Sequence, residues 1–292
     1  MKGIIIKAIS GFYYVEAGNQ LYECKARGIF RKDKISPLVG DRVEISVTGS
    51  KGIVESIEHR KNQLLRPPLA NLDKLFIVSA FSTPAPNPLI IDRLISIAEH
   101  KGIEPVIVFN KSDLGSFDEF RTVYVNAGFK TFVVSCENGE GFNDMLSCFD
   151  GCISAITGNS GVGKSSILNY LIPSLSIETG EVSMKLGRGR HTTRQVELYP
   201  VSNGYIADTP GFSSIDFERC EVIMKEELPD TFREFKPYLG DCQFTSCSHT
   251  TEKGRAILEA VGNGEISHSR HNSYCTIYNE IKGLKSWELS KK

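Results

Sequence analysis

The 292 residues suit two or three small domains, and the content of 40% hydrophobic and 24% charged residues is ordinary for a soluble globular protein. The net charge of −1 gives no argument that the whole molecule binds a polyanion. The start lacks the cleavage pattern of a secretory signal and no apolar stretch reaches about 18 residues. We therefore expect a cytoplasmic protein with no membrane span, whose eight cysteines are thiols or metal ligands rather than disulfides.

The amino-terminal segment is predicted to form short strands separated by turn residues. The strand sequences are GIIIKAI, FYYVEA, QLYECKA, DRVEISV and GIVESIE. About five such strands fit a small barrel such as an OB-fold, with an SH3-like barrel or part of a larger sheet as alternatives. Residues 1–66 hold twelve Lys and Arg against seven Asp and Glu, which indicates either a nucleic-acid-binding surface or a chance asymmetry. We place an OB-fold, RNA-binding domain at 1–66 and expect phosphate contacts from Lys25, Arg27, Arg31, Lys32 and Lys34.

From about residue 72, near-continuous apolar strands alternate with helical segments, which is typical of a doubly wound α/β domain. We place this domain at residues 67–217, and a mostly helical domain with a Cys/His cluster at 218–292. A helix is predicted over 89–100, and strands are predicted at LDKLFIVSAF, 105–109, 132–134, 153–157 and 205–207.

Residues 158–165, GNSGVGKS, match the phosphate-binding pattern G-x-x-x-x-G-K-[ST]. An apolar strand precedes them and the helical segment 166–171 follows, so an accidental glycine-rich turn is disfavoured. We expect Lys164 to lie between the β- and γ-phosphates and the Ser165 hydroxyl to bind Mg²⁺, and we assign both residues to catalysis. The residues assigned to nucleotide contact here are Gly158, Asn159, Ser160, Gly161, Val162, Gly163, Lys164, Ser165 and Ser166.

The tetrapeptide Asn110-Lys111-Ser112-Asp113 follows the strand at 105–109 and favours GTP over ATP. A carboxylate at Asp113 can accept hydrogen bonds from both N1–H and N2–H₂ of guanine, a donor pair that adenine lacks. Ser135 and Cys136 follow the next strand and fit a short element that contacts the guanine O6 through backbone N–H groups. We assign Asn110, Lys111, Asp113, Ser135 and Cys136 to base recognition.

Asp208-Thr209-Pro210-Gly211 follows the strand at 205–207, where Asp208 suits an outer carboxylate of the Mg²⁺ site and the Gly211 N–H suits the γ-phosphate. Thr192 and Thr193 are candidates for a switch threonine, and Thr193 is assigned to Mg²⁺ and to catalysis. Because ligands of open α/β sheets bind at the carboxyl ends of the strands, we expect these elements to converge.

Two further residues bear on hydrolysis. Phe212 stands where many GTPases carry a glutamine that orients the attacking water, so we expect the isolated enzyme to be slow. His191 is a candidate catalytic residue, with an RNA contact or a solvated loop histidine as alternatives.

The order of these elements is circularly permuted, because the NKSD and serine elements precede the phosphate loop instead of following it. In this order the sequence resembles the circularly permuted, ribosome-associated GTPases of the RsgA or YjeQ family. The resemblance covers nearly the whole chain and includes RPP at 66–68, NKSD at 110–113, GNSGVGKSS at 158–166, GRGRHTTR at 187–194 and DTPGF at 208–212.

The resemblance implies a GTPase that binds the small ribosomal subunit and its ribosomal RNA late in assembly. It also implies that the subunit stimulates hydrolysis of GTP to GDP and phosphate. We expect a monomer. The alternative is a regulatory GTP-binding module with a protein partner and negligible turnover, and an ATP-dependent metabolic kinase is disfavoured by NKSD.

The family's carboxy-terminal zinc site has the form C-x4-C-x-H-x5-C. Cys242, Cys247 and His249 match its first three ligands, but the fourth position is Arg255, which does not bind zinc. The candidates to complete the shell are Cys275, Cys220, Glu252 and water, and a metal-free domain stabilised by packing is the other alternative.

Overall fold

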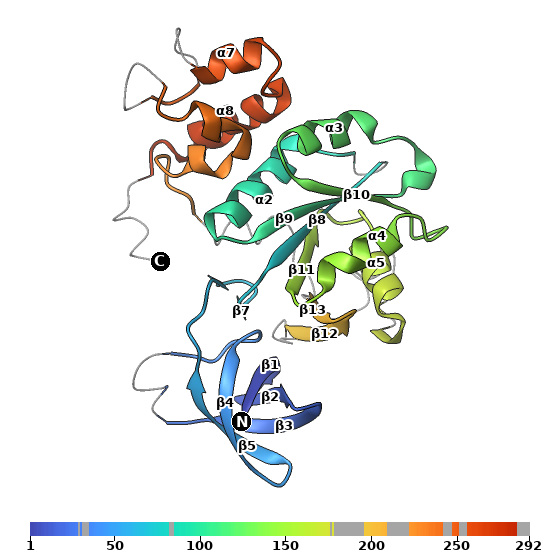
Figure 1. Ribbon diagram of the computed structural model, residues 1–292, viewed down its shortest axis with the longest axis vertical. Coiled ribbons are helices and arrows are strands. Elements are labelled where there is room, and N and C mark those ends of the chain that lie inside the picture. Colours follow the sequence, from blue (N-terminus) through green and yellow to red (C-terminus); the bar gives the residue numbers. More distant parts are fainter. Residues whose placement is uncertain are drawn as a thin grey trace.

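The computed structural model describes residues 1–28, 30, 35–81, 85–175, 177, 196–208, 222–241, 247–250 and 256–284, with Asp208 described at its backbone only. Within these residues, eleven strands form one sheet in the order β10-β9-β8-β11-β13-β12-β1-β2-β3-β5-β4. The barrel, the central sheet and the carboxy-terminal helices follow one another along the molecule (Figure 1).

The first five strands form a barrel. Neighbouring strands β1, β2 and β3 are antiparallel, β3 and β5 are parallel, and β4 pairs with both β5 and β1, which closes the barrel. The predicted small barrel of five strands is confirmed, and its inward-facing residues are apolar, as alternation along a strand requires. The bounds are Lys2–Ile9 for β1, Phe12–Ala17 for β2, Gln20–Ala26 for β3, Arg42–Thr48 for β4 and Lys51–Ile57 for β5.

A short connection leads from the barrel to the central domain. Its two-stranded piece consists of β6 (Gln63–Leu64) and β7 (Leu69–Ala70). Arg60 binds the fully buried Asp41 carboxylate through two hydrogen bonds of 2.7 and 2.8 Å, so the connection is fixed to the barrel.

The central domain contains a parallel sheet, as predicted. Its parallel strands are β8 (Lys74–Ala80), β9 (Glu104–Asn110), β10 (Lys130–Val134), β11 (Ile153–Gly158) and β13 (Gly204–Asp208). Strand β12 (Glu197–Val201) is antiparallel to β13 and pairs with β1 at Lys7 and Glu197, so the barrel and the central sheet are continuous. The sequence did not predict β12.

Helices cover both faces of this sheet (Figure 1). Alternate residues of a strand face opposite sides, so one side of β8 presents Leu75 and Ile77 to helices α2 and α3, and the other presents Phe76 and Val78 to α4 and α5. The bounds are Pro88–His100 for α2, Asp118–Asn126 for α3, Phe142–Leu146 for α4 and Lys164–Leu171 for α5.

The carboxy-terminal residues that the structure describes form helices and short helical turns packed on α2. They are η5 (Leu228–Thr231), η6 (Arg233–Tyr238), α7 (Ala256–Gly262) and α8 (His268–Ile281). Arg270 of α8 is 1% exposed and binds Asp92 of α2 and Glu234 of η6, each at 2.6 Å. None of the described helices is long and apolar enough to cross a membrane.

Candidate nucleotide-binding site

The phosphate loop, residues 158–165, has the strand-to-helix context that its motif predicts. All six residues of β11 are buried, and α5 begins at Lys164, so the last two residues of the motif form the first turn of the helix. Gly163 has a φ of +94°, and a Cβ at this position would lie 2.2 Å from the Asn110 amide nitrogen, so the loop requires glycine there. Free backbone N–H groups at the start of α5 give the loop the character of an anion site.

Lys164 is held over this loop by its own backbone. Its ammonium group donates hydrogen bonds to the carbonyl oxygens of Gly158 at 2.8 Å and Asn159 at 2.7 Å. Burial lowers the pKa of Lys164 to about 8, because removing the ammonium from water disfavours its charged form. An anion bound in the loop offsets this desolvation, so the position suits a phosphate group.

Asn110 joins the three loops that the sequence assigned to the nucleotide. It ends β9 and is 2% exposed. Its amide donates to the carbonyl of Val162 in the phosphate loop at 2.9 Å, and its side-chain oxygen accepts from the Cys136 thiol at 3.6 Å. Burial raises the pKa of Cys136 to about 11, so this thiol is neutral at ordinary pH and acts as a donor.

Asp113 is oriented by a neighbouring serine. Asp113 lies in the short turn Ser112–Leu114 (η1), and its Oδ1 accepts a hydrogen bond of 2.5 Å from the Ser135 hydroxyl. Ser135 is fully buried, and its hydroxyl also accepts from the Glu137 N–H at 3.2 Å. The carboxylate is therefore fixed in direction, as recognition of two adjacent donors on a planar base requires.

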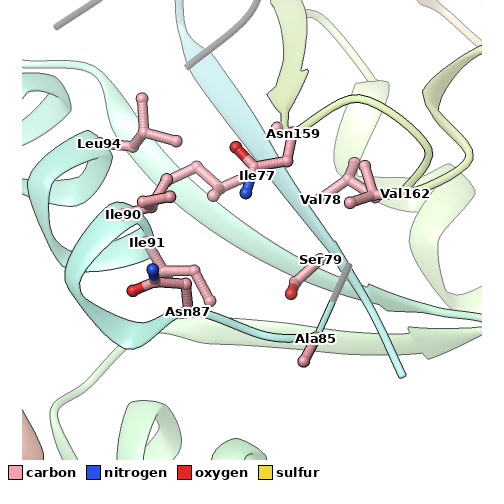
Figure 2. A pocket seen from close by; sticks show the side chains of 11 residues that line it. Ile77, Val78, Ser79, Ala85, Asn87, Ile90, Ile91, Leu94, Asn159 and Val162 are labelled. Atoms are coloured by element: carbon pink, nitrogen blue, oxygen red, sulfur yellow. The ribbon is translucent and has the colours of Figure 1, made fainter. Parts of the chain in front are cut away.

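A small pocket lies behind the phosphate loop (Figure 2). Val78 of β8, Ile91 and Leu94 of α2, and Asn159 and Val162 of the loop line it. Its volume of about 10 Å³ admits about one water molecule, so it is no nucleotide site. It marks the place where α2 packs against the loop.

The remaining predicted nucleotide residues divide into two groups. Ser160, Ser165 and Ser166 lie in the phosphate loop or the first turn of α5, and the backbone of Asp208 ends β13, the parallel neighbour of β11 at the same edge of the sheet. The others lie outside the described residues and stay predictions, namely His191, Thr192, Thr193, Gly211 and Phe212.

The Cys/His cluster is described only in part. Cys247 and His249 are in contact, with 3.1 Å between Sγ and Nδ1. Cys275 lies 3.7 Å from Nε2 of His271 on the same helix. Among the described residues, no group of three or more His, Cys, Asp and Glu is arranged to hold a metal. Cys242, Arg255, Cys220 and Glu252 lie outside them.

Sequence reasoning missed the residues that brace these loops. Glu140 accepts from the Ser112 hydroxyl at 3.3 Å, which ties the NKSD element to the loop after β10. Phe142 and Tyr170 form a stacked aromatic pair next to the same loop. The glycines at 139 and 141 were the available signal, since they indicate close approach of a backbone to its neighbours.

Comparison with known proteins gives full-length matches. The family model described as RsgA GTPase matches residues 57–218, and the model described as RsgA N-terminal domain matches residues 2–54. Two relatives, from Halalkalibacterium halodurans and Caldanaerobacter subterraneus, are each named "Small ribosomal subunit biogenesis GTPase RsgA" and are 44% identical to this chain. The first match covers 96% of this chain and 97% of the relative, and the second covers 97% and 96%.

Solved structures agree with this result. The crystal structure of YloQ, described as a circularly permuted GTPase, has a TM-score of 0.81 at 34% identity and covers 97% of this chain and 96% of that one. YjeQ from Thermotoga maritima has a TM-score of 0.80 at 33% identity, with 97% and 99% covered. The predicted permuted GTPase fold is confirmed. Asn110 joins the loops that the sequence assigned to the base and to the phosphates, and the chain belongs to the RsgA family of circularly permuted GTPases and hydrolyses GTP.

Proposed function

We propose that this GTPase binds the small ribosomal subunit late in assembly and hydrolyses GTP to GDP and phosphate when the subunit stimulates it. The observation that carries the proposal is the 44% identity, over nearly the whole chain, to proteins named small ribosomal subunit biogenesis GTPases. Similarity confined to the GTPase domain would support only nucleotide binding, whereas here the barrel and the carboxy-terminal helices are included. The protein is expected to act as a monomer in the cytoplasm.

The contacts within the site support the following proposed residue roles. Asp113, fixed by Ser135, accepts from the two guanine donors, and Lys164 neutralises charge between the β- and γ-phosphates. Mg²⁺, when bound, would neutralise further phosphate charge; the Ser165 hydroxyl and Thr193 are its proposed ligands, with Asp208 as an outer carboxylate. The first turn of α5 supports this assignment for Ser165, since that turn begins at the phosphate loop.

Hydrolysis needs a group that orients water, and the side chain of Phe212 has no hydrogen-bonding atom to do so. We propose that this group becomes effective on the ribosome and that His191 is a candidate for it. Contact between His191 and RNA is the other role proposed for this residue.

The barrel is proposed to contact ribosomal RNA. Lys25 is exposed and its ammonium lies 5.1 Å from the centre of the Phe12 ring, while Arg27 is paired with Glu55 at 2.7 Å. Contacts of basic side chains with RNA phosphates release counterions, so the affinity of the barrel for RNA should fall steeply with salt. The barrel is also tied to the GTPase sheet, through the Lys7–Glu197 ion pair of 2.6 Å. We propose domain limits of 1–66, 67–217 and 218–292.

A zinc ion is proposed for the carboxy-terminal domain. Cys247 and His249 supply a contacting sulfur and nitrogen donor, a set that zinc binds well, with Cys242 as the third ligand. The fourth ligand stays open among Cys275, Cys220, Glu252 and water. Measured zinc content of the purified protein and of a Cys247→Ser variant tests this proposal, and a zinc-free, folded wild-type protein would contradict it.

The test of the main proposal is co-sedimentation with purified small subunits. We expect the protein to pellet with subunits in a non-hydrolysable GTP analogue and less so in GDP, and Lys164→Ala to lose this difference. The matched control is Lys130→Ala, because Lys130 is exposed at the opposite, amino end of β10. No pelleting in either nucleotide would contradict the proposal and favour a regulatory module with another partner.

A further inference from the structure

We infer that Tyr170 is a positioning residue that holds the guanine-binding loop against the helix of the phosphate loop. The loop in question, called the serine loop, comprises residues 135–141 between β10 and α4. Tyr170 lies on α5, which begins at Lys164. This inference rests on the proposed guanine site and adds a residue that touches neither the base nor the phosphates in the assigned roles.

The contact is an aromatic stack. The ring of Tyr170 lies on the ring of Phe142, the first residue of α4, with centroids 3.9 Å apart and planes inclined by 21°. Phe142 is fully buried, whereas Tyr170 is 43% exposed. The tyrosine therefore covers the outer side of a buried anchor, at the point where α4 and α5 run close together (Figure 1).

The backbone of the serine loop approaches the tyrosine directly. A Cβ built on Gly139 would lie 2.9 Å from the Tyr170 hydroxyl oxygen and 3.6 Å from two carbons of its ring. Gly139 also has a φ of +78°, a conformation that other residues adopt at a cost. The backbone of the serine loop at Gly139 therefore packs directly against Tyr170.

Displacement at Gly139 would reach the base-binding carboxylate in two short steps. The Gly139 N–H donates to the carbonyl of Ser135 at 2.9 Å, and the Ser135 N–H donates to the carbonyl of Glu140 at 3.2 Å, so the loop is closed on itself. The Ser135 hydroxyl then holds Asp113 at 2.5 Å. A loop that moves off Tyr170 takes with it the serine that fixes Asp113.

This geometry predicts an effect on nucleotide retention and none on the chemical step. Tyr170 connects the helix that binds phosphate to the loop that binds the base, so it keeps the two halves of the site at a fixed separation. Without Tyr170, the serine loop is less ordered, and the nucleotide must order it on binding. This cost weakens nucleotide binding without changing the phosphate contacts.

The experiment measures release of fluorescently labelled GDP from wild type, Tyr170→Ala and Tyr170→Phe by stopped flow. We expect Tyr170→Ala to release GDP roughly three- to tenfold faster, the effect of losing one stacked aromatic pair. Tyr170→Phe keeps the stack and should stay close to wild type. At saturating GTP, kcat with small subunits should be unchanged in Tyr170→Ala while KM rises.

Three further variants make the outcome decisive. Val125→Ala, at a side chain of α3 that is 48% exposed, controls for loss of an exposed apolar group and should not change release. The methyl group of Gly139→Ala would press on the Tyr170 hydroxyl and should speed GDP release. Adding Tyr170→Phe removes that hydroxyl oxygen, the atom nearest to the new methyl group, and should bring GDP release part of the way back to the wild-type rate. This pair tests the contact even if Tyr170→Ala lowers the melting temperature.

Unchanged GDP release in Tyr170→Ala, or a fall in kcat without faster release, would overturn the inference. A wild-type protein that retains labelled ADP as well as labelled GDP would instead overturn the guanine site itself. The two failures are therefore distinguishable in one set of measurements.

Discussion

Replacing Arg270 with Met should lower the free energy of unfolding by about 3–5 kcal/mol, the cost of removing one partner from a buried ion pair. Arg270 is 1% exposed, and its guanidinium binds Asp92, which is fully buried, and Glu234, which is 7% exposed on its side chain. The guanidinium also lies 4.5 Å from the centre of the Phe232 ring. A surface pair would lose about 0–1 kcal/mol, so the magnitude distinguishes a buried junction from an exposed one.

The structure also fixes the pH dependence of this variant. Burial raises the pKa of Asp92, and the charge of Arg270 opposes that rise. Removing the arginine should raise the pKa of Asp92 further, so the folded variant binds a proton in a pH range where the unfolded chain does not. A carboxyl group whose pKa is raised in the folded state makes the protein less stable as pH rises. The free energy of unfolding that Arg270→Met loses relative to wild type should therefore be smaller at pH 5 than at pH 7.

Urea unfolding of wild type and variant at both pH values measures these effects. The unfolding of the GTPase domain is followed separately through a bound fluorescent nucleotide. The matched control is Arg93→Met, because Arg93 pairs with Glu280 at 2.7 Å on the surface of the same junction. Adding Asp92→Asn to Arg270→Met should recover part of the loss. A loss below about 1 kcal/mol, equal to that of the control, would show that Arg270 contributes no more than a surface ion pair.

Three further predictions concern the nucleotide site. Asp113→Asn should weaken GTP binding about 10- to 100-fold and shift preference toward xanthosine triphosphate, because a charged acceptor is lost; equal affinities for GTP and ATP in the wild type would contradict this. Lys164→Ala should abolish turnover but leave the melting temperature of the nucleotide-free protein unchanged or higher. Burial lowers the pKa of Lys164 and so disfavours its charged form, which means that the folded protein gains nothing from this charge when no nucleotide is bound. Unaltered turnover would exclude the assigned role. Alkylation of Cys136 should still accelerate about tenfold per pH unit between pH 8 and 10, since its pKa is about 11; a rate that levels off near 8.5, the value of an ordinary thiol, would contradict the burial argument.

The sequence predicted most strands because each has a regular pattern of burial. Strand β11 is buried at every residue and reads as a continuous apolar run, and the barrel strands show alternation. Strand β12 was missed, since Pro200 lies within it and its pairing depends on β13 and on β1 of the barrel. The motif spacing predicted where the phosphate loop and the NKSD element lie, because both follow such strands.

Contacts between distant residues were beyond prediction. Asn110 meets Val162 across 52 positions of sequence, and Arg270 meets Asp92 across 178. An arginine flanked by Ser269 and His271 is expected at the surface, so its full burial depends on tertiary packing. The Tyr170–Phe142 stack has the same origin, since neither residue belongs to a nucleotide-binding motif.

The rate of GTP hydrolysis with and without purified small ribosomal subunits shows whether this protein is a subunit-stimulated GTPase. We expect slow hydrolysis by the isolated protein, marked stimulation by small subunits, and no stimulation in Lys164→Ala. ATP should not be hydrolysed at a comparable rate in either condition. An equal rate of GTP hydrolysis in the presence and absence of subunits would contradict a role in which the small subunit stimulates this GTPase.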